Sequence, residues 1–331
     1  MTGDAPAARQ DAAGGTAQAA AGTPAESTVE GGSGDTQSAE SDSTPAGAGR
    51  SSRLRRLLVR SRPRFWLYLG GPALVGAVWG ARTPGELLDP VLLAMVAYFL
   101  VPANVFLYGV NDVFDAEIDS LNPKKNPTGR EVRFVPDRDA GLMVAVTVSG
   151  LVALPFAAVL PPAGVLAMLV FLALAIEYSA PPLRFKTTPL LDSLSNGLYV
   201  LPGVVTYAAV AGSPPPLLAI GGGWLWTMAM HTYSAIPDIE ADETAGIRTT
   251  ATVLGPTGAL AYCLGCWLAA AVAFAVLAPE LGLLFVVYPL FGLAIGVFDV
   301  DVGRAYWWFP VVNAVAGAAL TIGGIWLLYG G

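Results

Sequence analysis

The sequence predicts an all-α protein, a polytopic membrane helical bundle of nine transmembrane helices. Hydrophobic residues make up 54% of its 331 residues and charged residues only 13%, about half the charged share of a typical soluble domain. From Phe65 onward, nine apolar runs are long enough to cross about 30 Å of hydrocarbon. The runs are continuously apolar rather than alternating, which favours helices over the strands of a membrane barrel.

The nine runs are separated by Pro/Gly pairs or charged loops. They cover residues 65–82, 90–110, 140–160, 163–179, 190–212, 216–236, 257–278, 281–298 and 306–329. Gly and Ala are frequent inside them, which suits close packing of helices in lipid. Cys263 and Cys266 lie within the seventh run. We expect buried free thiols there, because a zinc site needs more ligands.

The N-terminal part divides into a tail and a basic segment. Residues 1–49 hold seven acidic residues and one basic residue. They also lack aromatic residues, so we expect a disordered acidic tail. Residues 50–64 carry seven arginines directly before the first run. This position favours a juxtamembrane anchor on anionic membrane lipids over a nucleic-acid-binding patch. Residues 65–331 then form the membrane domain.

The basic residues predict an orientation, because positively charged loops stay in the cytoplasm. If residues 50–64 are cytoplasmic, then so are the loops after the second, fourth, sixth and eighth runs. In this arrangement 17 of the 18 Lys and Arg residues fall on one side, and only Arg82 falls on the other. We therefore expect a multi-pass protein of the cell membrane with a cytoplasmic N-terminus.

An acidic cluster marks the end of the second run. Asn111, Asp115 and Asp119 are four residues apart. Steps of four residues turn by only about 40° on a helix, so the three side chains share one face. Carboxylates on the continuation of a membrane helix are costly and usually functional. Asp112 lies about 100° from Asn111 on such a helix, so it ranks lower as a direct ligand.

Asp238 and Asp242 repeat this spacing after the sixth run, with Glu240 off their shared face. Both acidic clusters leave the membrane on the cytoplasmic side, so they can meet at one membrane level. Oxygen ligands without neighbouring Cys specify Mg²⁺ rather than zinc, and bound Mg²⁺ usually bridges to substrate phosphates. Arg184 and Lys186, after the fourth run, face the same side and are suited to a diphosphate.

Three stretches together resemble the UbiA superfamily of intramembrane prenyltransferases. They are NDxxDxxxD at 111–119, YSxPPxRxK at 178–186 and DxxxDxxxG at 238–246, and the resemblance covers 65–330. Within the superfamily, residues 190–199 and 230–255 look most like the lycopene elongase (lycopene elongase/hydratase) branch of haloarchaea and actinobacteria. The last motif departs from the more usual form, because Ala241 stands where Gly is common.

The resemblance implies roles for individual residues. The Mg²⁺ ligands would be Asn111, Asp115, Asp119, Asp238 and Asp242, among which Asp115, Asp238 and Asp242 rank as catalytic. The diphosphate ligands would be Asn111, Arg184 and Lys186, with Lys125, Tyr178 and Arg248 as weaker candidates. His231 lies on roughly the same helix face as Asp238 and is a candidate to guide proton loss or water capture. A packing role for His231 is the alternative, and Glu177 is a second candidate base.

The resemblance also implies a reaction. A C5 dimethylallyl group would move from its diphosphate to the end of lycopene, with or without hydration, toward C50 carotenoids such as bacterioruberin. The same reaction with a glycerol-phosphate lipid, a quinone precursor, or a chlorin or haem acceptor is the alternative, although the few remaining basic residues favour a neutral acceptor. A membrane transporter is a more distant alternative, because its acidic residues should lie near the middle of the bilayer.

Overall fold

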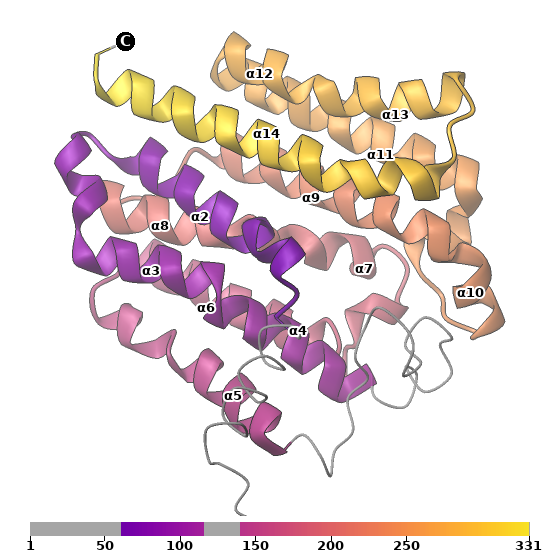
Figure 1. Cartoon of the computed structure of the whole chain (residues 1–331), viewed down its shortest axis with the longest axis horizontal. Helices are drawn as coiled ribbons and strands as arrows, with labels where there is room; N and C mark the ends of the chain where they lie inside the picture. The colour runs from indigo at the N-terminus through magenta and orange to yellow at the C-terminus, as the bar shows by residue number, and fades with distance from the viewer. Residues whose placement is uncertain (1–60, 116–139, 331) are drawn as a thin grey trace, which may run out of the picture. The chain divides into compact units, whose positions relative to one another are not determined.

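The computed structural model describes residues 61–115 and 140–330, and Figure 1 shows their arrangement. Contacts separate residues 1–45 from residues 46–331, and every described residue belongs to the second unit. The described residues form helices and loops without a strand among them, so the all-α prediction is confirmed for this part. The acidic tail, nearly all of the basic segment, Asp119 and Lys125 lie outside the described residues.

The elements follow one another with short connections, and η marks a 3₁₀ helix. In chain order they are η1 (Pro63–Phe65), α2 (Trp66–Gly80), η2 (Pro84–Leu88), α3 (Pro90–Leu100), α4 (Pro102–Asp115), α5 (Ala140–Leu151), η6 (Leu154–Ala158), α6 (Pro162–Glu177), η7 (Phe185–Thr187), α7 (Leu191–Leu194), η8 (Ser195–Tyr199), α8 (Leu201–Ala211), α9 (Leu217–Ala235), η9 (Ile236–Asp238), α10 (Ile239–Thr244), α11 (Thr250–Leu277), α12 (Pro279–Phe285), α13 (Val287–Val297) and α14 (Val302–Leu328).

Six stretches of the described part are long and apolar enough to cross a membrane. They are Pro90–Asp115, Gly141–Ala158, Leu191–Ala211, Thr250–Leu277, Pro279–Val297 and Val302–Leu328. The other three predicted runs correspond to α2, α6 and α9. α2 and α6 have 15 and 16 residues, whereas a spanning helix needs about 20. α9 is longer but more polar, and its last turns carry His231 and Ser234. The chain is therefore a multi-pass membrane protein, while the count of nine spans is not confirmed.

α3 shows how the sequence starts a helix. Pro90 occupies its first position, and the Asp89 carboxylate accepts hydrogen bonds from the N–H groups of Val91 and Leu92 at 2.8 and 3.0 Å. A proline there loses no hydrogen bond, because the first N–H groups of a helix have no partner inside it. The aspartate supplies acceptors for two of those groups. The start of this spanning stretch is thus encoded in two adjacent residues.

α2 and α8 pack side by side in the same direction. A Cβ atom on Gly76 would lie only 2.0 Å from the carbonyl oxygen of Gly203. One turn further along both helices, Gly80 faces the backbone of Tyr207 in the same way. Glycines at these positions let the two backbones touch, which is the usual form of helix packing in lipid.

The last helix returns beside the first. The Trp79 Nε1–H group of α2 donates a hydrogen bond to the carbonyl oxygen of Leu320 in α14 at 3.0 Å. Nearer the start of both helices, the Asn313 amide donates to the Tyr68 hydroxyl at 3.4 Å. α14 therefore runs in the same direction as α2 and α8.

α9 and α11 pack antiparallel and form the centre of the second half of the bundle. The Cys263 thiol of α11 donates a hydrogen bond to the carbonyl oxygen of Ala229 at 3.3 Å. At the other end of the pair, Gly222 of α9 faces Phe274 of α11. Cys263 is buried and Cys266 is half-buried, and both are free thiols, as the sequence predicted.

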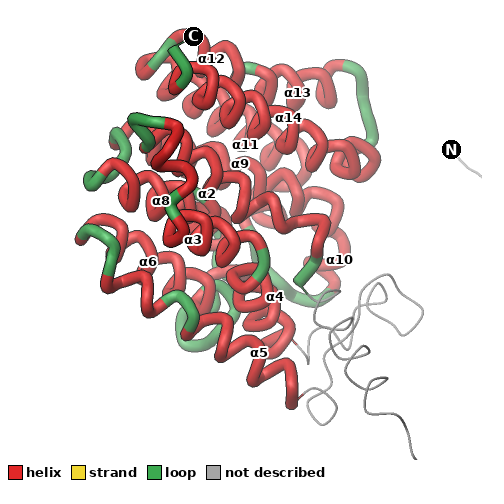
Figure 2. Tube along the Cα trace, turned by 60° about the vertical axis from the view of Figure 1, so that its left-hand side comes forward, coloured by secondary structure: helices red, strands yellow, loops and turns green. Residues whose placement is uncertain are grey.

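The polar parts of the chain gather at one end of these helices. The end of α4, the loop between α6 and α7, the α9–α10 turn and the start of α11 all lie there (Figure 1). Figure 2 shows the ends of α4 and α10 on the same side from a second direction. The connections from α2 to α3 and from α8 to α9 lie at the opposite end of the bundle.

Candidate active site

The first acidic motif stands on the last turns of α4. Asn111 and Asp115 are one helical turn apart, as their spacing predicted. The Ser179 hydroxyl donates a hydrogen bond to Oδ1 of Asn111 at 2.8 Å. The buried Asp115 carboxylate contacts the Lys186 ammonium and lies 3.5 Å from an Arg184 nitrogen. The structure therefore joins the predicted acidic and basic residues in one cluster.

The loop after α6 folds back so that both cations reach Asp115. The Lys186 N–H donates to the carbonyl oxygen of Tyr178 at 3.1 Å, and the Arg184 N–H donates to that of Ala180 at 3.0 Å. Arg184 has a φ of 42°, a left-handed backbone that residues other than glycine rarely adopt. Burial lowers the pKa of Lys186 to about 8, against the opposing charge of Asp112. The loop thus holds a desolvated ammonium beside a guanidinium.

Arg62 and Asp112 form a second ion pair beside this cluster. Their charged atoms are 3.4 Å apart, and the Arg62 guanidinium lies 4.8 Å from the centre of the Tyr108 ring. Sequence reasoning ranked Asp112 low because of its helix face, and it treated Arg62 only as part of a membrane anchor. The available signal was the position of Arg62, three residues before the first apolar run.

Aromatic rings line the interior next to the second ion pair. The Phe65 ring stacks on Tyr68 at 5.4 Å between centroids and lies 6.2 Å from Tyr108. The Tyr68 ring meets Tyr199 edge-on at 6.2 Å. Aromatic faces attract cations, as the position of the Arg62 guanidinium over Tyr108 illustrates. The interior beside the charged cluster is therefore suited to a carbocation.

The second acidic motif differs from the predicted continuous helix. α9 ends at Ala235, Asp238 closes the 3₁₀ turn η9, and Asp242 lies in the short helix α10. Pro237 explains the break, because it has no N–H group to continue the helix. Gly246, the last residue of the motif, has a φ of 69° and ends α10. Its side-chain freedom lets the chain turn back toward α11.

Tyr178 lies between the second acidic motif and the loop of the first cluster. Burial raises the pKa of its phenol, and the charges of Asp192 and Asp242 raise it further. The neighbouring Ser179 bonds to Asn111, as described above. Tyr178 and Ser179 therefore carry the connection from Asn111 to the vicinity of Asp242.

The donor set fits a hard cation. Asn111, Asp115, Asp238 and Asp242 offer amide and carboxylate oxygens, which are the ligands that Mg²⁺ prefers. Within residues 61–115 and 140–330, no three His, Cys, Asp or Glu side chains lie close enough to hold one ion. The cations beside Asp115 match the charge of a diphosphate, so the described residues suit a cation and a diphosphate together.

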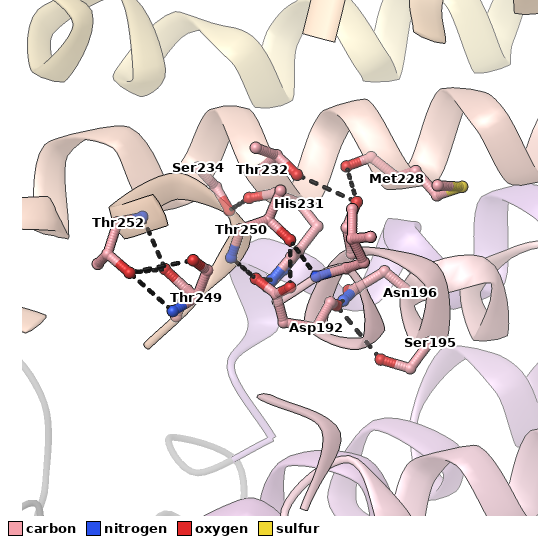
Figure 3. A network of polar contacts seen from close by, with 12 residues as sticks. Asp192, Ser195, Asn196, Met228, His231, Thr232, Ser234, Thr249, Thr250 and Thr252 are labelled. Carbon is pink, nitrogen blue, oxygen red and sulfur yellow. Dashed lines mark hydrogen bonds and ion pairs between the residues drawn. The ribbon is translucent and has the colours of Figure 1, made fainter. Parts of the chain in front are cut away.

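Sequence reasoning missed a buried carboxylate, that of Asp192 in α7. The side chain is fully buried and accepts hydrogen bonds from both the N–H and the hydroxyl of Thr250 (Figure 3). The His231 Nε2 atom lies 3.7 Å from its Oδ2 atom, and the His231 ring meets the Tyr178 ring edge-on at 6.0 Å. The available signal was an acid inside the apolar run 190–212.

The remaining candidates lie at the margin. Arg248 is exposed and forms no ion pair with another described residue. Glu240 is exposed as well, and an oxygen of Glu177 is buried with no hydrogen-bond partner among the described residues. A cleft of about 620 Å³ opens between Thr83, Asp89 and their neighbours at the opposite end of the bundle. None of the predicted site residues lines it.

Known proteins with similar sequences and structures were then compared with the chain. The UbiA prenyltransferase family profile matches residues 69–307. The chain is 55% identical over 277 residues to the lycopene elongase/hydratase of Haloarcula japonica, covering 83% of this chain and 92% of that protein. It is also 55% identical over 272 residues to the Halobacterium salinarum protein of the same name, covering 82% and 98% of the two chains.

The fold is similar to that of a UbiA homologue from Archaeoglobus fulgidus, solved with DMAPP and Mg²⁺ bound. The TM-score is 0.64 at 21% sequence identity, and the match covers 81% of this chain and 98% of that one. The sequence match and the joining of the aspartate and cation motifs at one end of the bundle lead to the same conclusion. The chain belongs to the UbiA prenyltransferase family and is an enzyme that transfers prenyl groups.

Proposed function

We propose that this prenyltransferase moves a C5 dimethylallyl group from its diphosphate to the terminal double bond of lycopene, in C50 carotenoid (bacterioruberin) biosynthesis. The relatives named lycopene elongase/hydratase support the acceptor, and the ligands of the Archaeoglobus fulgidus homologue support the donor and Mg²⁺. The reaction takes place at the cytoplasmic face of the cell membrane, on the side that carries the basic loops.

The contact of Asp115 with Lys186 and Arg184 carries the proposal. A buried carboxylate needs a neutralising partner, and in the free protein two cations serve this purpose. A prenyl diphosphate bound with a divalent cation offers the same pair of charges. Asp115 then binds the divalent cation, and Arg184 and Lys186 bind the phosphate oxygens.

Charge stabilisation at this cluster drives the departure of the diphosphate. Mg²⁺ held by Asn111, Asp115, Asp119, Asp238 and Asp242 would supply Lewis-acid stabilisation of the leaving group. Arg184 and Lys186 stabilise the same developing negative charge. The rings of Tyr68, Tyr108 and Tyr199 face the positive charge left on the allyl group. The surrounding apolar helices keep water away from it.

A neutral acceptor fits the distribution of cations. Arg62, Arg184 and Lys186 are the described cations that pair with the aspartates of the cluster. Arg248 is exposed, and the exposed Arg304 lies in the loop before α14. An anionic acceptor would need further cations beside the cluster. The π electrons of a polyene need none, because its terminal double bond is itself the nucleophile.

The test is a product assay on membranes that contain the full chain, at high salt with Mg²⁺, lycopene and dimethylallyl diphosphate. We expect carotenoids enlarged by one and two C5 units, identified by mass spectrometry. Asp115→Asn should lower their formation about 100-fold or more, because it removes a charge that acts at the leaving group. A chelator should abolish product formation, and added Mg²⁺ should restore it.

Asp299→Asn is the matched control, since Asp299 is an exposed acid in the loop before α14, and this variant should retain activity. Enlarged products from the Asp115→Asn variant at the wild-type rate would contradict the assignment of the cluster. Diphosphate release with a quinone precursor, a glycerol-phosphate lipid or a chlorin, but not with lycopene, would keep the prenyltransferase and reject the acceptor.

A further inference from the structure

We infer that His231 is the general base of a hydration step that follows prenyl transfer, and that Asp192 is its positioning residue. The inference rests on the proposed function, because water can add only to the cation left on the acceptor. Its starting point is the juxtaposition of these two side chains next to the diphosphate cluster. Neither has a part in the departure of the diphosphate.

Asp192 is held rigidly from three directions. Its Oδ2 atom accepts a hydrogen bond from the Thr250 N–H at 2.9 Å, and its Oδ1 atom accepts one from the Thr250 hydroxyl. The Asn196 amide donates to the backbone carbonyl of Asp192 at 2.6 Å. The Leu190 N–H in turn donates to the Thr250 hydroxyl at 2.8 Å. The carboxylate therefore has one fixed orientation at the start of α11 (Figure 3).

His231 faces this carboxylate from α9. Its Nε2 atom lies 3.7 Å from Oδ2 of Asp192, which itself has no exposed side-chain surface to speak of, at 1%. The imidazole is 17% exposed, and no described residue forms a hydrogen bond with its Nδ1 atom. A histidine with one nitrogen toward a fixed carboxylate and the other open has the arrangement of a positioned base.

The open side of the imidazole lies next to the diphosphate cluster. Its ring contacts Tyr178 edge-on at 6.0 Å between centroids, and the next residue, Ser179, donates to Asn111. The charge of Asp242 also acts on Tyr178. His231 is thus one side chain away from residues on both acidic motifs. A water molecule at Nδ1 would be close to the reacting end of a bound acceptor.

The step balances as follows. The terminal double bond of the acceptor forms a C–C bond to the allylic carbon while the C–O bond to the diphosphate breaks, and its electron pair leaves on the diphosphate. The positive charge then rests on a tertiary carbon of the acceptor. A water oxygen forms a C–O bond to that carbon, and one water proton passes to Nδ1 of His231. The imidazolium is stabilised by Asp192 until the proton returns to solvent.

Asp192 also fastens α11 to α7, and this structural role alone would give Thr250 its acceptors. It would not require a histidine with an open nitrogen on the opposite side of the carboxylate. The two roles predict different results, because loss of fastening affects every activity of the enzyme. Loss of the base changes only what happens to the acceptor cation.

The experiment compares product ratios in the membrane assay with lycopene and dimethylallyl diphosphate. In His231→Gln, we expect the ratio of hydrated to unhydrated prenylated product to fall about 100-fold, the usual contribution of a general base. Diphosphate release should stay within about threefold of the wild type, because prenyl transfer precedes the step. Asp192→Asn keeps an acceptor for Thr250 and should lower the ratio about tenfold.

The double variant tests whether Asp192 acts through His231. In the His231→Gln background, Asp192→Asn should cause no further fall in the ratio, whereas independent structural effects would add. Ser234→Ala is the control, since this hydroxyl on the same helix bonds only to the His231 carbonyl, at 2.7 Å. This variant should leave the ratio unchanged.

Three results would overturn the inference. They are an unchanged ratio in His231→Gln, equal loss of diphosphate release and hydration in that variant, and additive effects in the double variant. Wild-type membranes that prenylate lycopene without adding water would overturn it as well, while the proposed function would stand. Wild-type membranes that do not prenylate lycopene at all would reject the proposed acceptor and the inference together.

Discussion

At the scale of single residues, the buried acids of the described part are matched by cations. Asp115 contacts Lys186 and Arg184, and Asp112 pairs with Arg62. Removing a charge from water costs several kcal/mol, and breaking such a pair by removing one partner leaves that cost uncompensated. In a substrate-binding cluster, the same cations also form the binding site for the incoming anion.

Lys186→Gln should therefore weaken the binding of the prenyl diphosphate. A charge-assisted hydrogen bond contributes about 1.5 kcal/mol or more, so we expect KM for dimethylallyl diphosphate to rise at least about tenfold. Steady-state kinetics on membranes measure this directly. Arg304→Gln is the control, because it removes an exposed cation on the same side of the bundle. Equal changes of KM in the two variants would show that Lys186 contributes only to the general field.

Spacing along the chain was enough to find Asn111, Asp115, Arg184 and Lys186, and the structure brings them together. Helical periodicity is local, so it reports which residues share a face. It could not find the partner of Asp192, since Thr250 is 58 residues away. Arg62 was missed for a similar reason, because its pairing with Asp112 depends on how the first helix meets α4.

At the scale of elements, the apolar runs located the helices but not their breaks. The run 216–236 was expected to carry Asp238 and Asp242 on its continuation, yet α9 ends at Ala235. Pro237 was visible in the sequence, and a proline at that place ends a helix. Close helix contacts such as that of Gly76 with Gly203 could not be predicted, because they depend on which helices become neighbours.

Gly76→Ala should destabilise the fold, whereas Gly71→Ala on the same helix should not. The new Cβ at Gly76 would lie 2.0 Å from the Gly203 oxygen and 2.6 Å from the Thr206 hydroxyl, while nothing lies within 4 Å at Gly71. Overpacking costs about 1–3 kcal/mol, and alanine in an open helical position is favourable by up to about 1 kcal/mol. Thermal unfolding in detergent, followed by size-exclusion chromatography, measures both. Equal midpoints for the two variants would contradict the packing of α2 on α8.

At the scale of the whole membrane unit, the shared direction of α2, α8 and α14 places one set of loops at the end that carries the acids. Positively charged loops belong in the cytoplasm, and Arg184, Lys186 and Arg248 are all at this end. We therefore propose that the diphosphate enters from the cytoplasm, where soluble prenyl diphosphates are available without crossing the membrane.

Single cysteines test this orientation. In a background with Cys263→Ala and Cys266→Ala, we would place Gly85→Cys in the α2–α3 connection and Ala245→Cys after α10. Both positions are exposed. A membrane-impermeant maleimide should label Gly85→Cys in intact cells and Ala245→Cys only in inside-out vesicles. Labelling of both cysteines from one side would refute the proposed topology.

The hydrogen bond from Trp79 to Leu320 joins residues that are 241 positions apart. Ribosomes add about 5–20 residues per second, so α2 waits on the order of tens of seconds for α14 to be made. During that interval the first helix sits in the bilayer with one flank open to lipid. A nascent chain that loses its last helix would therefore keep an unfinished first helix, and this gives quality-control proteases a mark for premature termination.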